Sequence, residues 1–214
     1  MAHNESFDIA GPAGRLEAIL MTPEGPPVAA GVVCHANPLQ GGVMHFKVVF
    51  RAAKALQQHG VAVLRFNFRG VGRSEGTHDQ GRGEQDDVRA ALAEVQRRFP
   101  ALPVVLGGFS FGASMALRVG CAERSVHALF ALGLPVTMMT DLSFLPTCRP
   151  PRLFVQGERD QFGGADRMRE LVARLPEPRA LVIVPGADHF FGGHLEEMQE
   201  AVGAWAAPRP WAAA

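Results

Sequence analysis

A serine stands between two glycines at the centre of a Gly-x-Ser-x-Gly motif, residues 108–112 of this 214-residue chain. An apolar run over residues 102–106 precedes the motif, and a helix-forming run over residues 113–117 follows it. A strand, a sharp turn and a helix in this order expose the serine hydroxyl for use as a nucleophile. The sequence therefore predicts that Ser110 attacks a carbonyl, with the N–H of Phe111 facing the oxygen that becomes negative.

Two further side chains have the types needed to activate such a serine. Asp160 follows an apolar run that begins at residue 153, and His189 follows another over residues 180–184. Open α/β sheets place their sites at the carboxyl ends of the strands, where both residues are expected. Serine is a weak nucleophile until a base takes its proton, so we expect His189 to be that base. Asp160 would orient the imidazole and stabilise its charged form.

Each of these residues also has a purely structural interpretation. Ser110 could be a small residue that closes a tight turn, and Asp160 could form a turn by itself. His189 could be a half-buried loop histidine. The weaker candidates for the acid and the base are Asp188, Asp141, Asp166, His194 and His35.

The segment over residues 35–42, after another predicted strand, is the expected source of a second oxyanion donor. Such a donor is a backbone N–H that lies about 3 Å from the developing charge. Pro38 has no N–H and is excluded. The choice between Asn37 and Leu39 stays open at this point.

Composition and motifs argue against several other functions. Lys plus Arg and Asp plus Glu both number 21, so no net field favours nucleic acid or an anionic membrane surface. No apolar stretch approaches the roughly 18 residues of a membrane span. The histidines form no H-x-H or H-x-x-x-H pair and no C-x-x-C occurs, so we expect no bound metal. A phosphate-binding G-x-x-x-x-G-K-[ST] loop is also missing, and we expect no cofactor.

Two charged, glycine-containing stretches are interpreted as structural. Residues 70–76 follow a strand but lack the dinucleotide-binding spacing, so we interpret them as a turn, with Arg69 and Arg73 solvated or bracing the loop. Residues 83–87 are most simply an acidic first turn that faces a helix dipole.

Cysteine usage and the amino terminus bear on the compartment. Cys34, Cys121 and Cys148 are odd in number and widely spaced, which favours buried small hydrophobic residues over a disulfide framework. Residues 1–6 lack the charged region and apolar core of a secretory signal. A cytoplasmic location is the resulting expectation.

Hydrophobic patterning predicts an α/β protein with a mainly parallel sheet and helices on both faces. Residues 7–9 and 16–21 form an expected antiparallel hairpin around a turn at residues 11–14. Further strands are expected at residues 28–35, 61–68, 102–106, 129–134, 153–157 and 180–184, and amphipathic helices at 84–99, 168–175 and 195–205.

These elements define one expected domain over residues 1–207. Residues 208–214 are expected to be a frayed tail, in which Trp211 could dock. About 18 residues separate the strands that end at Leu134 and begin at Leu153, near the upper limit of ordinary connections. No large cap fits there, which predicts an open, shallow site.

With these residues assembled, the chain resembles the small, cap-less α/β-hydrolases related to dienelactone hydrolase, and most closely a bacterial group of short serine esterases. The matching stretches are residues 34–42, 64–76, 108–113 and 185–191. The resemblance implies the α/β-hydrolase fold, with Ser110, Asp160 and His189 as a catalytic triad in the family's chain order.

We therefore expect a serine hydrolase that cleaves a small carboxylic ester through an acyl-serine intermediate, without cofactor or metal. Its only expected partner is a small-molecule acyl substrate, and its oligomeric state is left open. A thioesterase or a peptidase would use the same residues. A non-catalytic small-molecule binder on the same fold is the alternative from another class.

Overall fold

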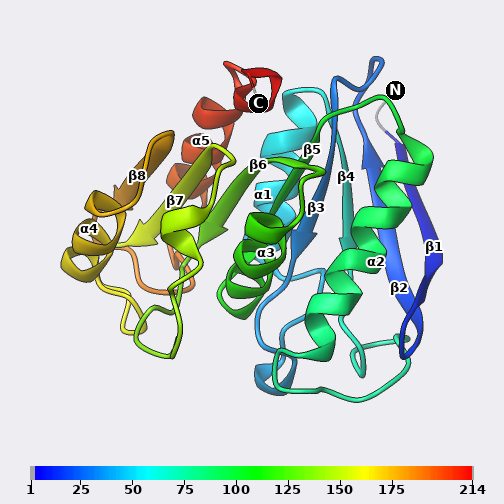
Figure 1. Ribbon diagram of the computed structural model, residues 1–214, viewed down its shortest axis with the longest axis horizontal. Coiled ribbons are helices and arrows are strands. Elements are labelled where there is room, and N and C mark those ends of the chain that lie inside the picture. Colours follow the sequence, from blue (N-terminus) through cyan, green and yellow to red (C-terminus); the bar gives the residue numbers. More distant parts are fainter. Residues whose placement is uncertain (1–2, 214) are drawn as a thin grey trace.

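In the computed structural model, which describes residues 3–213, one eight-stranded sheet runs through the chain in the order β1-β2-β4-β3-β5-β6-β7-β8 (Figure 1). The strands are β1 (His3–Gly11), β2 (Gly14–Thr22), β3 (Ala29–Cys34), β4 (Val61–Phe66), β5 (Val104–Phe109), β6 (Val126–Leu132), β7 (Arg152–Gly157) and β8 (Arg179–Val184). β1 and β2 form the expected antiparallel hairpin, and β2 pairs antiparallel with β4. All the other pairs are parallel.

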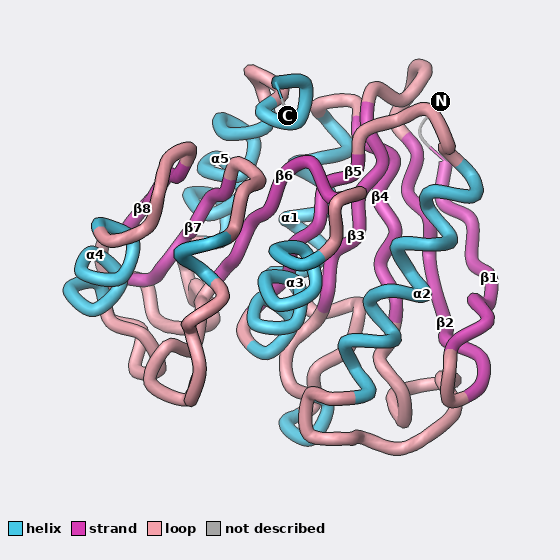
Figure 2. Tube along the Cα trace, viewed as in Figure 1, coloured by secondary structure: helices cyan, strands magenta, loops and turns pink. Residues whose placement is uncertain are grey.

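Helices cover both faces of this sheet (Figure 2). They are α1 (Lys47–Gln58), α2 (Gly83–Arg98), α3 (Phe111–Ala122), α4 (Ala165–Ala173) and α5 (Leu195–Ala206). The apolar sides of α2, α3 and α4 share one core cluster, and those of α1 and α5 share the other. Because helices bury both sheet faces, β3, β4 and β5 are buried along their whole lengths, as their continuous apolar runs predict.

The parallel strands all end at the lower edge of Figure 1, where the loops that follow them gather. Residues 133–151, which connect β6 to β7, contain one short 3-10 turn, η2 (Leu145–Thr147), and no α-helix. The fold therefore has no large cap, as expected. Within residues 3–213, no helix combines the length and the apolar character that crossing a membrane requires.

The expectation of three unpaired cysteines was wrong. Cys121, at the end of α3, forms a disulfide with Cys148, which precedes β7. The sequence separation of 27 residues does not predict this disulfide, because the two cysteines meet only through the path of the chain from α3 through β6. That path returns the chain to within 4.6 Å between the two Cα atoms, inside the range that a disulfide spans. Cys34 is buried and free, as expected.

The carboxyl-terminal tail also differs from the expected frayed segment. Residues Pro210–Ala213 form a 3-10 turn, η3. Within it, Trp211 is only 2% exposed and its ring centroid lies 6.4 Å from that of Trp205 on α5. Burial of a large aromatic ring fixes this part of the tail to the domain. Ala214 lies outside the described residues.

Candidate active site

Ser110 lies on a strained turn between β5 and α3. Its φ of 56° and ψ of −118° fall in a region that side-chain-bearing residues rarely adopt. A methyl group on Gly108 would meet the backbone of Gly112 at 2.6 Å, and one on Gly112 would meet the carbonyls of Cys34 and His35. Glycine is therefore required on both sides of the serine, because the start of α3 lies against the end of β3.

The structure brings Ser110, His189 and Asp160 together in one hydrogen-bonded chain. The Ser110 Oγ lies 2.9 Å from Nε2 of His189, and Nδ1 of His189 lies 2.7 Å from Oδ2 of Asp160. Both His189 and Asp160 are almost completely buried. Because an ionised carboxylate only accepts hydrogen bonds, Nδ1 carries the imidazole proton and Nε2 can accept the proton of Ser110.

Two further groups hold the Asp160 carboxylate in place. The side-chain amide of Gln156 donates to its Oδ2 at 2.7 Å, and the N–H of Phe162 donates to its Oδ1 at 2.8 Å. The ring of Phe162 also meets the imidazole of His189 edge-on, with centroids 4.7 Å apart. Our sequence reasoning missed both residues. The available signal was Gln156 itself, a polar side chain inside an apolar strand, which requires buried partners.

None of the weaker candidates hydrogen-bonds to Ser110 or His189 within the described chain. Asp188 instead accepts the N–H groups of Phe190 and Gly192, and so stabilises the turn around His189. The remaining candidates pair elsewhere: Asp141 with Arg118, Asp166 with Arg169, and His194 with Glu197.

The geometry separates the two candidates for the second oxyanion donor. The N–H of Leu39 donates to the side-chain oxygen of Asn37 at 2.9 Å, so it is already engaged. The backbone N–H of Asn37 has no hydrogen-bond partner among residues 3–213. Asn37 also lines the cavity next to Ser110 and Phe111, whereas Leu39 does not. These observations favour Asn37 over Leu39.

His35 fixes the direction of the Asn37 N–H. The N–H of Phe68 donates to Nε2 of His35 at 3.0 Å, so the imidazole proton is on Nδ1 and donates to the Ala36 carbonyl at 2.7 Å. In a trans peptide the C=O and the N–H point in opposite directions. Holding the Ala36 carbonyl therefore aims the Asn37 N–H away from His35. Burial lowers the pKa of His35 to about 4, which keeps the ring neutral.

Residues at the end of β4 and directly after it hold the far end of the same loop. Asn67 accepts the N–H of Met44 at 2.8 Å, and Arg65 donates to the Met44 carbonyl at 2.6 Å. The loop over residues 35–44, which we call the oxyanion loop, is thus anchored at both ends by residues of β4 and the turn behind it. Arg65, Asn67 and Phe68 belong to the strand predicted at residues 61–68, and this second role of theirs was not predicted.

The two arginines assigned to the turn at residues 70–76 differ: Arg69 is buried and braces the loop, whereas Arg73 is largely exposed. Arg69 binds the carboxylate of Asp87 through Nε and through Nη2, the latter at 2.7 Å, and Asp87 is fully buried. Glu84 is buried as well and accepts the N–H groups of Asp79 and Gly81. These two carboxylates therefore brace the loop before α2. Glu84 and Asp86 lie in the first turn of α2, as the acidic run at residues 83–87 predicts. Asp87 is occupied instead by its pairing with Arg69.

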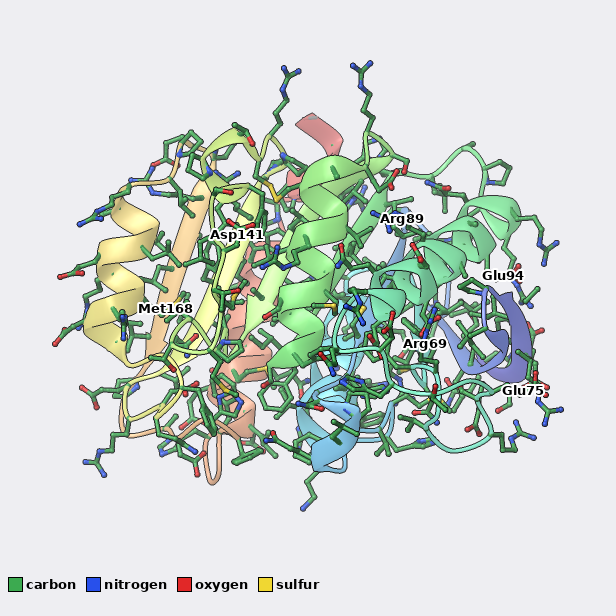
Figure 3. All side chains as sticks on the ribbon, turned by 60° about the horizontal axis from the view of Figure 1, so that its bottom comes forward. Arg69, Glu75, Arg89, Glu94, Asp141 and Met168 are labelled. Atoms are coloured by element: carbon green, nitrogen blue, oxygen red, sulfur yellow. A yellow bond between two sulfur atoms is a disulfide. The ribbon has the colours of Figure 1, made fainter. Side chains whose placement is uncertain are left out.

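A cavity of about 350 Å³ opens beside Ser110. One face of α3 forms its floor, and the start of α2 and the β6–β7 connection form its walls. Figure 3 shows Asp141, from that connection, next to α3, and Arg69 next to α2. The lining residues are Asn37, Gln40, Gln80, Gly81, Arg82, Gln85, Ser110, Phe111, Ser114, Met115, Arg118, Pro135, Met138, Met139, Thr140 and Phe162.

The sheet order, the serine turn and the buried histidine beside it define an α/β-hydrolase. Comparison with known proteins agrees, because the family model described as "Alpha/beta hydrolase domain" matches residues 40–206. The chain belongs to this family.

Relatives cover nearly the whole chain. An uncharacterised protein of Rickettsia prowazekii is 38% identical over 200 residues, which are 90% of this chain and 84% of the relative. The structure of an α/β serine hydrolase homologue from Coxiella burnetii superposes with a TM-score of 0.89 at 37% identity and covers 95% of this chain and 97% of that one. The structure of a serine hydrolase without lid from Xanthomonas campestris superposes with a TM-score of 0.88 at 34% identity. This match covers 98% of this chain and 95% of that one. The expected resemblance to small, cap-less hydrolases is confirmed.

A partial match comes from a protein with an assigned activity. A pimeloyl-[acyl-carrier protein] methyl ester esterase of Xanthomonas campestris is 33% identical over 116 residues, which are 53% of this chain and 46% of the esterase.

Proposed function

We propose that the protein hydrolyses small carboxylic esters through an acyl-serine intermediate on Ser110. The observation that carries the proposal is the hydrogen-bonded chain from Ser110 through His189 to Asp160, on a serine turn next to a cavity. A protein that only binds its ligand needs neither this series of hydrogen bonds nor the strained backbone at Ser110.

Each residue has a defined role in the proposed reaction. Ser110 Oγ attacks the ester carbonyl while His189 Nε2 takes its proton, and ionised Asp160 stabilises the imidazolium. The N–H groups of Phe111 and Asn37 donate to the oxyanion of the tetrahedral intermediate. His189 then gives its proton to the departing alcohol. A water molecule, activated by the same histidine, hydrolyses the acyl-serine and restores the enzyme.

The preference for an ester rests on the relatives. Serine hydrolases are among the similar structures, and the partial match carries the name of a methyl ester esterase. Thioesters and amides would react through the same groups, so matched substrates must distinguish them. We therefore expect a nitrophenyl ester of a short acid to be cleaved faster than the corresponding thioester or anilide.

Labelling with a fluorophosphonate, mapped by mass spectrometry, tests the activated nucleophile. The adduct should form on Ser110, be absent in Ser110→Ala and form much more slowly in His189→Ala. Ser114→Ala is the matched control, because Ser114 is a buried serine that lines the same cavity but has no histidine beside it. This control should be labelled like the wild type. A folded wild-type protein without any adduct would contradict the hydrolase proposal and favour a non-catalytic binder.

A further inference from the structure

Exposed apolar side chains gather on the loops around Ser110. Among residues 3–213, four large hydrophobic side chains are exposed: Leu39 at 73%, Met138 at 59%, Phe190 at 48% and Phe50 at 42%. The first three follow β3, β6 and β8 at the carboxyl edge of the sheet, where Ser110 also lies. Single exposed apolar residues need no explanation, but three on loops at the same edge of the sheet indicate a recognition surface.

The departing alcohol must lie beside His189. Because Nε2 of His189 returns the proton to the leaving oxygen, that oxygen comes within hydrogen-bond reach of the imidazole. The ring of Phe190 is 5.2 Å from the imidazole, and the half-buried ring of Phe46 is 6.1 Å from that of Phe190. Phe46 is itself stacked on Phe109, with centroids 5.7 Å apart. An aromatic wall, formed by Phe46 and Phe190, therefore flanks the position of the alcohol.

The acyl group has a different place. Once the carbonyl carbon is bonded to Ser110, its oxygen faces the backbone donors and its alcohol faces His189. The acyl group takes the remaining direction, into the cavity of about 350 Å³, to whose lining His189, Phe46 and Phe190 do not contribute. Met115, Met138 and Met139 are among the apolar residues that line it. Methionine side chains adapt to irregular shapes, which suits a flexible aliphatic chain.

We propose, on the basis of the esterase function, that the physiological substrates are esters of an apolar, ring-bearing alcohol. Phe190 determines the preference for that alcohol, and Met138 determines the preference for the acyl chain. The two selectivities are separable, since the two side chains lie on different loops and only Met138 lines the cavity beside Ser110.

Benzyl butyrate and methyl butyrate provide the test. They share the acyl group, and their alcohols have similar acidity, so the ratio of their kcat/KM values reports recognition of the alcohol. The wild type should prefer the benzyl ester. Phe190→Ala should reduce the benzyl-to-methyl ratio about threefold to tenfold, the range of an aromatic pair contact. Phe190→Leu, which keeps an apolar surface, should retain part of the preference.

Two variants serve as controls. Phe50→Ala removes another exposed phenylalanine, on α1, and should leave the ratio unchanged. Met138→Ala should alter the ratio between methyl hexanoate and methyl butyrate but leave the benzyl-to-methyl ratio unchanged. Phe190→Ala should show the reverse pattern.

The outcomes separate this inference from the esterase proposal. If Ser110 is labelled by fluorophosphonate but Phe190→Ala keeps the wild-type benzyl-to-methyl ratio, the alcohol site is wrong and the esterase proposal stands. The same conclusion follows if Phe190→Ala slows both esters equally, because Phe190 would then only position His189. If Ser110 is not labelled and neither ester is cleaved, the esterase proposal itself fails.

Discussion

The N–H of Phe68 donates to Nε2 of His35 at 3.0 Å, and this bond determines which nitrogen of the imidazole carries the proton. The other nitrogen then donates to the carbonyl of Ala36 at 2.7 Å and so orients the Ala36–Asn37 peptide. The segment that follows β4 thereby orients a backbone N–H on the loop after β3. Two positions more than thirty residues apart in the chain act on one peptide group.

Replacing His35 should therefore impair the oxyanion interaction without removing the nucleophile. We expect His35→Ala to lower kcat by about 10-fold to 100-fold with little change in KM, because an aimed donor stabilises the transition state more than the substrate. Steady-state kinetics on a nitrophenyl ester measures both constants. His45→Asn, at an exposed histidine directly after the oxyanion loop, should behave like the wild type. A rise in KM with unchanged kcat would contradict this role.

His35 also makes the stability of the fold depend on pH. Its pKa falls from 6.5 to about 4 on burial, so the unfolded chain binds more protons between these values. The free energy of unfolding should accordingly fall as the pH is lowered from about 6.5 to about 4, by up to about 3 kcal/mol. Urea unfolding at about pH 7 and about pH 4.5 measures the difference. In His35→Gln this contribution should be missing, and an equally steep decline in the variant would assign it to other groups.

Gln156 is an uncharged side chain whose amide donates a hydrogen bond to the Asp160 carboxylate. Gln156→Glu would place a second carboxyl group against Oδ2 of Asp160, and like charges this close cannot both ionise easily. We expect the acidic limb of the pH–rate profile to move to higher pH by about one unit or more. The pH dependence of kcat/KM measures this shift. Gln161→Glu, at an exposed neighbour, is the control and should leave the limb in place.

The ion pair between Arg69 and Asp87 is a test of the structural scaffold. Arg69→Met would leave the fully buried Asp87 without its partner and should reduce the free energy of unfolding by about 3–5 kcal/mol. The double variant with Asp87→Leu should recover much of that loss. Arg73→Met, whose guanidinium is largely exposed, should cost less than about 1 kcal/mol. Chemical denaturation measures the free energy of unfolding of all three variants. Equal losses of stability in Arg69→Met and Arg73→Met would contradict the expectation that only the buried ion pair matters.

The fold was predictable because its central strands are continuous apolar runs bounded by turns. The Gly-x-Ser-x-Gly motif and the chain order of Ser110, Asp160 and His189 sufficed to place these three residues at one edge. Helix α1 was not singled out, although its buried side consists of small and branched apolar residues. These include Val48, Val49, Ala52 and Ala53.

Other features depend on contacts that spacing does not encode. The choice of Asn37 over Leu39 follows from the Asn37 side chain, which engages the rival N–H. The burial of Glu84 and Asp87 depends on the loop before α2 and on Arg69, so the acidic run alone predicted a first helical turn but not buried carboxylates. The supporting roles of Gln156 and Phe162 likewise require the paths of two separate strands.

The disulfide between Cys121 and Cys148 closes a covalent ring around part of the site. The ring contains β6 and the cavity wall with Met138, and it begins at the end of α3, the helix that Ser110 precedes. In the chain-entropy model, closing a loop with the sequence separation of 27 residues observed here disfavours the unfolded ensemble by about 3.5 kcal/mol. Ser110, His189 and Asp160 lie outside the ring, so we expect reduction of the disulfide to loosen the cavity wall more than these three residues.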